Sequence, residues 1–140
     1  IWETHPQKDR IEMKGALPNH LVREEMVQAD IFVLPCRVDP QGDRDGIPVV
    51  LMEAMAAGMA VISGDVPSIR ELVEDGETGK MVAPGDVQDL TRALHEILTD
   101  DSLKTTFAQA GRQRVKDEFS LDTAVKRILE NLIKRNLVTP

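Results

Sequence analysis

The part of the sequence best suited to chemistry is a polar segment, 39–46, followed by the almost entirely apolar segment 47–57. Pro48 near the start of the apolar segment and Gly58 directly after it predict a helix over 48–57. The N-terminus of a helix offers unpaired backbone N–H groups and a partial positive charge, an arrangement that suits a diphosphate.

The first turn of this helix should provide the hydrogen-bond donors. Pro48 has no amide hydrogen, so Val49 and Val50 are the expected donors to a bound phosphate. Gly46, just before the helix, would let a ligand approach the backbone because no side chain stands in the way.

Glu53 is the charged exception in the predicted helix, since every other residue from 47 to 57 is apolar or small. A carboxylate among apolar residues costs free energy unless it has a partner. A sugar diol is one candidate, because a carboxylate can accept two hydroxyl donors at once. The alternative is an internal ion pair with a loop arginine such as Arg70, and the residue pattern by itself favours this internal partner.

Short apolar runs alternate with helical patterns through residues 11–83. The expected strands are 11–14, 31–34, 60–63 and 80–83, and the expected helices are 20–29, 48–57 and 67–73. Nearly continuous apolar strands are typical of a parallel sheet with both faces covered by helices. The alternation predicts an α/β, Rossmann-like parallel sheet flanked by helices. Ligands of such sheets bind beyond the carboxyl ends of the strands, where residues 35–53 are expected.

Residues 85–140 have helical patterns only. Asp86, Ser102 and Ser120 are expected to cap three helices at their N-termini. Apolar residues at helical spacing should face the interior: Leu90, Leu94, Ile97 and Leu98, then Leu103, Phe107, Ala110 and Val115, then Leu121, Val125, Ile128, Leu132 and Ile133. Nothing before residue 11 resembles a first strand with a phosphate loop, so residues 1–140 are expected to form a single, partial domain, the later part of a larger one.

The segment 45–58, Asp-Gly-Ile-Pro-Val-Val-Leu-Met-Glu-Ala-Met-Ala-Ala-Gly, resembles the acidic-x7-Glu signature of retaining family 4 (group 1) glycosyltransferases, which use nucleotide sugars and have the GT-B fold. Segments 29–35, 60–63 and 71–79 also resemble this family, so nearly the whole chain is covered. The resemblance implies the donor-binding, C-terminal half of an enzyme whose N-terminal domain is missing here, with the final helices packing toward that other half.

The same resemblance implies an activity. The enzyme would move a sugar, with retention, from a UDP- or GDP-sugar to an unknown carbohydrate or lipid-linked acceptor. The motif is similar to that of enzymes of exopolysaccharide and lipopolysaccharide synthesis, which implies a role in cell-surface polysaccharide or glycolipid synthesis.

The resemblance also implies roles for individual residues. Glu53 would bind the ribose hydroxyls, which reverses the preference stated above. The amides of Val49 and Val50 would face the diphosphate, with Gly46 and Ile47 in the same nucleotide-binding segment. Asp45 would contact the transferred sugar, at a position where the family usually has the longer Glu. The catalytic base, the basic pair for the diphosphate and a histidine of the N-terminal domain would lie outside this chain.

Asp39, Asp43 and Asp45 before Gly46 suggest a calcium-binding loop, but the register does not fit. With Gly46 at the sixth position of an EF-hand loop, Met52 occupies the twelfth, where a bidentate carboxylate is required. We therefore expect a solvated acidic loop, no metal, and no cofactor beyond the nucleotide sugar, which is a substrate.

A non-catalytic nucleotide-binding module of Rossmann or flavodoxin-like type is the alternative to a transferase. A dinucleotide site would need a glycine fingerprint after a first strand, and Gly42-x-x-x-Gly46 does not provide one. Binding of nucleotide diphosphates in preference to NAD or flavin would separate the two hypotheses.

Composition limits the kinds of partner and the cellular compartment that fit this chain. Seventeen Lys and Arg against 24 Asp and Glu give a net charge of −7, which disfavours nucleic acid as a partner. Cys36 is the single cysteine, which excludes an internal disulfide and fits a reducing cytosol. We expect neither a signal peptide nor a membrane span.

The expected location is therefore the cytoplasm. The basic residues of the last helix, Lys126, Arg127, Lys134 and Arg135, could touch an anionic membrane at its inner face, although capping and solubility explain them equally well.

Overall fold

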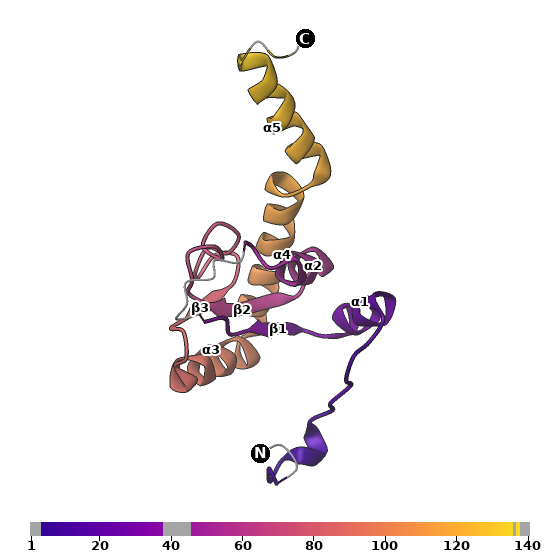
Figure 1. Ribbon diagram of the computed structural model, residues 1–140. Helices are drawn as coiled ribbons and strands as arrows, with labels where there is room; N and C mark the ends of the chain where they lie inside the picture. The colour runs from indigo at the N-terminus through magenta and orange to yellow at the C-terminus, as the bar shows by residue number, and fades with distance from the viewer. Residues whose placement is uncertain (1–3, 38–45, 136, 138–140) are drawn as a thin grey trace.

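Three parallel strands form the central sheet of the computed structural model, which describes residues 4–37, 46–135 and 137. They are β1 (Ile31–Leu34), β2 (Ala60–Gly64) and β3 (Lys80–Val82), in the order β1-β2-β3 (Figure 1). Ile31 pairs with Ala60, and Ile62 pairs with Lys80. Every residue of β2 is buried, as expected for a strand covered on both faces. The predicted α/β class and the strands near 31–34, 60–63 and 80–83 are confirmed.

The strand predicted at 11–14 is wrong. This segment is an extended connection between a short 3-10 helix, η1 (Lys8–Arg10), and α1 (Asn19–Gln28), and it lies away from the sheet in Figure 1. Met13 is 69% exposed. A strand exists only where a neighbouring backbone pairs with it, and none of the residues described here pairs with 11–14.

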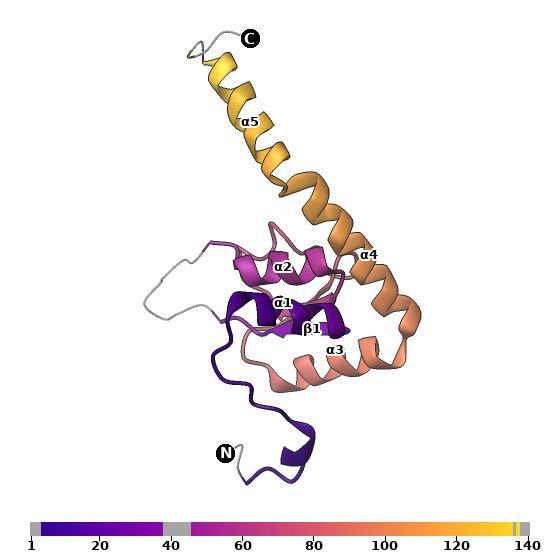
Figure 2. The same ribbon diagram turned by 90° about the vertical axis from the view of Figure 1, so that its right-hand side faces the viewer.

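Helices cover both faces of the sheet (Figure 2). On one face, α1 and α2 (Val49–Ala57) pack with Val61 of β2, and the core there includes Leu51 and Met55. On the other face, α3 (Val87–Thr99) packs on Ala60 and Ile62. The alternation of side chains along β2 therefore divides the core into two layers.

Helix α4 (Asp101–Glu118) contacts both layers. Phe107 belongs to the core beside α3, whereas Val115 packs against the core beside α2. Gly111 lies between these two residues, and a Cβ there would be 3.0 Å from the backbone oxygen of Thr78 and 3.2 Å from Met55. The absence of a side chain at Gly111 thus lets α4 approach α2 closely.

The segment predicted as a helix over 67–73 consists of consecutive turns instead. Ile69 and Leu72 donate hydrogen bonds to the carbonyl three residues earlier, whereas Arg70 and Val73 donate to the carbonyl four residues earlier. Because the two spacings alternate, no continuous helical ladder forms.

The predicted cap is confirmed at α3 and at α5 (Leu121–Lys134), but not at α4. Asp86 accepts hydrogen bonds from two backbone amides of α3, and Ser120 accepts one from Thr123. Helix α4 is capped by Asp100, and Ser102 lies inside its first turn, donating its hydroxyl hydrogen to Asp100. A carboxylate accepts amide hydrogen bonds more strongly than a hydroxyl does, which explains the earlier start.

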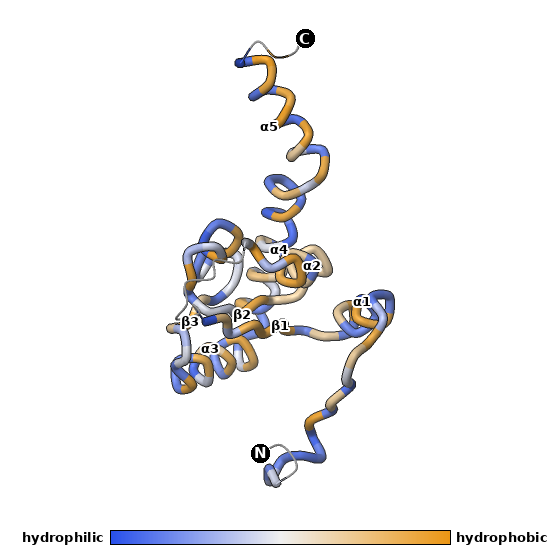
Figure 3. The backbone as a smooth tube through the Cα atoms, viewed as in Figure 1, coloured by the Kyte–Doolittle hydropathy of each residue, from blue (hydrophilic) through white to orange (hydrophobic). Residues whose placement is uncertain are grey.

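The prediction that the apolar faces of the C-terminal helices are buried is only partly confirmed. Leu98 of α3 is 63% exposed, whereas Ile97 is fully buried. The apolar face predicted for α5 points away from the rest of the chain, with Leu121 78% and Ile128 59% exposed. Figures 1 and 2 show α5 extending away from the sheet, and Figure 3 shows apolar positions recurring along it. Helical spacing identifies an apolar face, but it does not identify the surface that covers it.

Among the helices of the described ranges, none has both the length and the apolar content that crossing a membrane requires.

Candidate functional site

The carboxyl ends of the parallel strands meet at one edge of the sheet, and the connections that leave them form the candidate site. Residues 35–37 follow β1, residues 65–66 follow β2, and residues 83–86 follow β3. Helix α2 lies in the chain between the parallel strands β1 and β2, so it begins at the edge where β1 ends. Its N-terminus is therefore the helix end nearest the predicted ligand. This arrangement agrees with the location expected from the sequence.

The first turn of α2 has two backbone amides without an acceptor among the described residues. Pro48 is the N-cap, and no side chain of the described residues caps the helix. Leu51 and Met52 donate to the Pro48 carbonyl, at 3.0 and 3.4 Å, whereas no described residue accepts a hydrogen bond from the amide of Val49 or Val50. Val49 is 63% exposed. Within the described part of the chain these two amides have no acceptor, as is usual in the first turn of a helix; their binding of an anionic ligand stays a prediction.

The backbone at Gly46, just before α2, is accessible to solvent. An added Cβ at Gly46 would have no heavy atom within 4 Å, and Gly46 itself is exposed. Ile47 is half-buried and packs against the core beneath α2. The core contact of Ile47 thus anchors this segment while Gly46 stays accessible.

Glu53 lies one helical turn after Val49 and Val50, on the same face of α2, because residues three and four apart share a helix face. Its side chain is half-buried, and among the described residues none forms a hydrogen bond or an ion pair with its carboxylate. Glu53 therefore presents an unused acceptor beside the free amides.

The internal partner suggested for Glu53 is wrong. Arg70 binds Asp65 instead, with Nε 2.6 Å and Nη2 2.8 Å from the two carboxylate oxygens. This two-point hydrogen bond holds the pKa of the Asp65 carboxyl below its usual range. Both groups belong to the connection after β2, so the pair forms locally and leaves Glu53 without it.

Asp45, predicted to contact the transferred sugar, lies outside the described residues, as do Asp39 and Asp43. Within the described ranges, no group of three or more His, Cys, Asp or Glu side chains is placed to hold a metal ion. The structure thus brings together Gly46, Ile47, Val49, Val50 and Glu53 of the predicted site.

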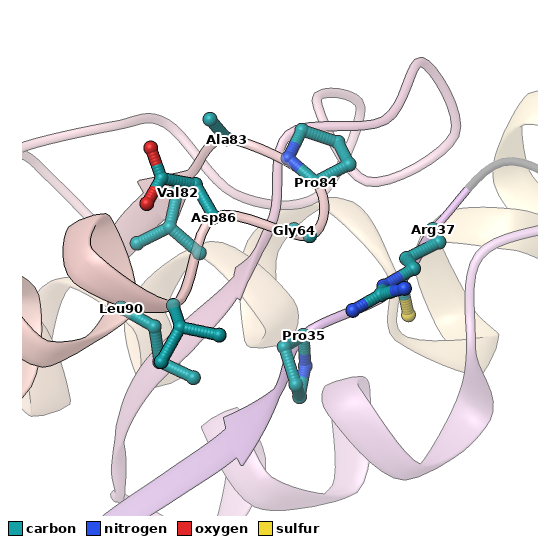
Figure 4. Close-up of a pocket in the computed structure, with 11 residues that line it drawn as sticks. Pro35, Arg37, Gly64, Val82, Ala83, Pro84, Asp86 and Leu90 are labelled. Atoms are coloured by element: carbon teal, nitrogen blue, oxygen red, sulfur yellow. The ribbon is translucent and has the colours of Figure 1, made fainter.

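Sequence reasoning missed a pocket on the α3 side of the same edge. A cavity of about 210 Å³ is lined by residues 35–37, Gly64, 82–87 and Leu90 (Figure 4). Its walls come from the connections after β1 and β3. The available signal was the position of these residues directly after apolar runs, but nothing in the sequence indicated that the two connections meet.

Gly64, the last residue of β2, lets the connection after β1 lie directly against that strand. A Cβ at this position would lie 2.0 Å from the Cys36 backbone oxygen, a separation that no side chain can have. The backbone after β1 therefore crosses directly over the end of β2.

Comparison with known proteins finds glycosyltransferases both by family model and by sequence identity. The family model described as "Glycosyl transferases group 1" matches residues 2–114. A Salmonella typhimurium protein, WcaL, named as a glycosyltransferase of colanic acid biosynthesis, is 39% identical over 136 residues, which cover 96% of this chain and 33% of that protein. This chain therefore spans about a third of the length of that relative.

Solved structures have the same fold. Sucrose-phosphate synthase from Thermosynechococcus elongatus superimposes with a TM-score of 0.75 at 28% identity, over 92% of this chain and 31% of that one. Anabaena Alr3699/HepE in complex with UDP has a TM-score of 0.68 at 23% identity, over 79% of this chain and 29% of that one.

The close approach at Gly64 predicts a specific loss of stability. We expect Gly64→Ala to destabilise the chain by roughly 1–3 kcal/mol, since the added methyl group forces the connection after β1 away from the end of β2. Gly46→Ala is the matched control, because its Cβ meets no atom, and it should change stability by less than about 0.5 kcal/mol. Urea unfolding followed by circular dichroism measures both; equal midpoints for the two variants would contradict the close approach.

Proposed function

Since the chain belongs to the group 1 glycosyltransferases, we propose that it binds the nucleotide-diphosphate sugar donor of a transferase. The donor is a UDP- or GDP-sugar, and the enzyme transfers its sugar with retention to a carbohydrate or lipid-linked acceptor in polysaccharide or glycolipid synthesis. The observation that supports this most directly is Glu53, a half-buried carboxylate without a partner among the described residues, on the same helix face as two free amides.

The geometry of α2 fits a nucleotide diphosphate. Four residues of helix separate Val49 from Glu53, a rise of about 6 Å along the axis. That spacing is comparable to the separation between the diphosphate and the ribose diol of a nucleotide. The amides of Val49 and Val50 bind the diphosphate, and the Glu53 carboxylate accepts hydrogen bonds from the ribose hydroxyls.

These groups act mainly on the leaving group. As the bond between sugar and diphosphate breaks, negative charge develops on the diphosphate, and fixed amide dipoles stabilise it without having to reorient. Asp45 contacts the transferred sugar, and basic groups outside residues 1–140 complete the binding of the diphosphate. The chain thus provides one wall of the reaction site.

The other wall is an N-terminal half of the enzyme. The uncovered apolar face of α5 supports this proposal, because the face has the spacing of a packed helix and contacts little of the described chain. The chain also covers only about a third of its relative WcaL. The enzyme works in the cytoplasm or at the inner face of the membrane, where Lys126, Arg127, Lys134 and Arg135 could contact anionic lipids.

Glu53→Gln should weaken the binding of UDP or GDP by about 1–3 kcal/mol, because a charged acceptor of two hydroxyl hydrogen bonds becomes neutral. Titration calorimetry on a protein with both halves is the measurement. Glu77→Gln, an exposed glutamate in the turns before β3, is the control and should leave the affinity unchanged. Equal affinities for all three proteins would exclude Glu53 from ribose binding.

Nucleotide binding should not require a divalent metal. The described residues include no cluster suited to one, and residues 39–45 do not fit a calcium-loop register. The dissociation constant for UDP or GDP should therefore change less than about twofold when EDTA is added. A large loss of affinity that magnesium or manganese restores would show that the acidic loop binds a metal.

Residues 1–140 alone should transfer no sugar, even where they bind nucleotide weakly. Holding donor and acceptor together can lower a barrier by roughly 7–11 kcal/mol, and that requires both walls of the site. A donor-hydrolysis and transfer assay should compare this chain with a protein containing both halves. Comparable turnover would place all catalytic groups within residues 1–140; no turnover in either protein, together with nucleotide binding, would favour a non-catalytic nucleotide-binding module.

A further inference from the structure

The pocket on the α3 side of the sheet edge is separate from the groups proposed to bind the donor. It is lined by residues 35–37, Gly64, 82–87 and Leu90, whereas Val49, Val50 and Glu53 belong to α2 and line none of it. Its lining combines apolar side chains with two charged ones, the cation Arg37 and the anion Asp86, which lie on opposite sides of the pocket (Figure 4). The apolar residues include Pro35, Val82, Pro84 and Leu90. The pocket is therefore a second candidate binding site at the same edge.

Arg37 has no counterion among the described residues. No hydrogen bond or ion pair joins its guanidinium to any of them, although the chain has a net charge of −7. The guanidinium lies against the backbone of the connection after β3, where a Cβ at Gly85 would be 3.5 Å from Nε and Cζ. Gly85 has a φ of +84°, a left-handed conformation that suits glycine, so a side chain there is disfavoured.

The carboxylates nearest the pocket in the chain already have partners. Asp86 accepts hydrogen bonds from the amides of Gln88 and Asp89, at 2.9 and 3.0 Å, and Figure 4 shows it across the pocket from Arg37. Asp89 accepts one from the Ala83 amide at 2.7 Å, and Asp65 is paired with Arg70. None of these carboxylates forms an ion pair with Arg37.

From this arrangement we propose that the pocket binds an oxyanion, a carboxylate or a phosphate, which belongs to the acceptor. A guanidinium binds planar or tetrahedral oxyanions through two hydrogen bonds at once, and Arg37 is exposed, so a ligand from solvent can reach it. The acceptor assignment depends on the proposed function, since the donor diphosphate is assigned to α2. The assignment of an oxyanion site does not depend on it.

Cys36 contributes to the pocket lining next to Arg37, and its half-buried side chain also packs against the core under α2. Its thiol, adjacent in the chain to Arg37, provides a test within the protein itself. Iodoacetate and iodoacetamide both alkylate a thiolate, whose sulfur displaces iodide, but only iodoacetate has a carboxylate. The ratio of the two rates at Cys36, measured by mass spectrometry of its peptide, does not depend on the fraction of thiolate. The same ratio in urea-unfolded protein is the reference.

We expect the ratio in the folded protein to exceed the reference by about fivefold at low salt, as one charge pair near a surface allows. Arg37→Gln should return the ratio to the reference, and added salt should lower it. Arg112→Gln is the matched control, because Arg112 lies beside Gly58 at the far end of α2, and it should leave the ratio unchanged. An unchanged ratio in Arg37→Gln, or a Cys36 that neither reagent modifies, would overturn the proposal.

Protection experiments distinguish the two sources of an oxyanion. Inorganic phosphate or glucuronate should slow the alkylation of Cys36 by iodoacetate, whereas neutral glucose should not. Protection by glucuronate supports an acidic sugar acceptor, and protection by phosphate supports a phosphate-bearing one; protection by neither contradicts the site.

Nucleotide affinity separates this proposal from the proposed function. Arg37→Gln should leave the dissociation constant for UDP unchanged. If the variant weakens UDP binding, the pocket belongs to the donor and the acceptor assignment is wrong. If UDP does not bind either protein but iodoacetate selectivity remains, the donor proposal fails and the oxyanion site stands.

Discussion

Strand β2 lies between two apolar layers and exposes none of its residues, and each neighbouring element is placed by its contact with this strand. Val61 faces the layer under α2, whereas Ala60 and Ile62 face the layer under α3. Burying each branched aliphatic side chain provides about 1.5–3 kcal/mol, so the position of β2 is strongly favoured. Because β1 and β3 pair with β2 in parallel, the carboxyl ends of all three strands meet at one edge, and this fixes where a ligand can bind.

Two kinds of surface meet at that edge. On the α2 side are backbone amides and the Glu53 carboxylate; on the α3 side is a pocket that contains the Arg37 guanidinium. Neither charged group has a partner among the described residues; the two have opposite sign and lie on opposite faces of the sheet. The first surface combines donors for an anion with an acceptor for hydroxyl groups, whereas the second offers a single cation, so the two proposed sites differ in chemistry.

The elements could be predicted from sequence where local patterns determine them. The apolar runs of β1 and β2 and the helix ended by Gly58 depend on few residues, and Glu53 stood out because its neighbours are apolar. Features that depend on distant partners could not be predicted in this way. The segment 11–14 has a strand-like pattern, but no described strand pairs with it. Arg70 pairs with the nearby Asp65 rather than with Glu53, and the pocket depends on the approach of Arg37, after β1, to Gly85, after β3.

Helix α4 contacts both apolar layers, through Phe107 on one side and Val115 on the other. Removing its last turns would uncover the layer under α2, and removing its first turns would uncover the layer under α3. The two layers should therefore unfold together, as one cooperative unit that ends near Glu118 rather than at residue 114, where the family match stops. Helix α5 is not part of this unit, so proteolysis within α5 should leave a stable core with all three strands.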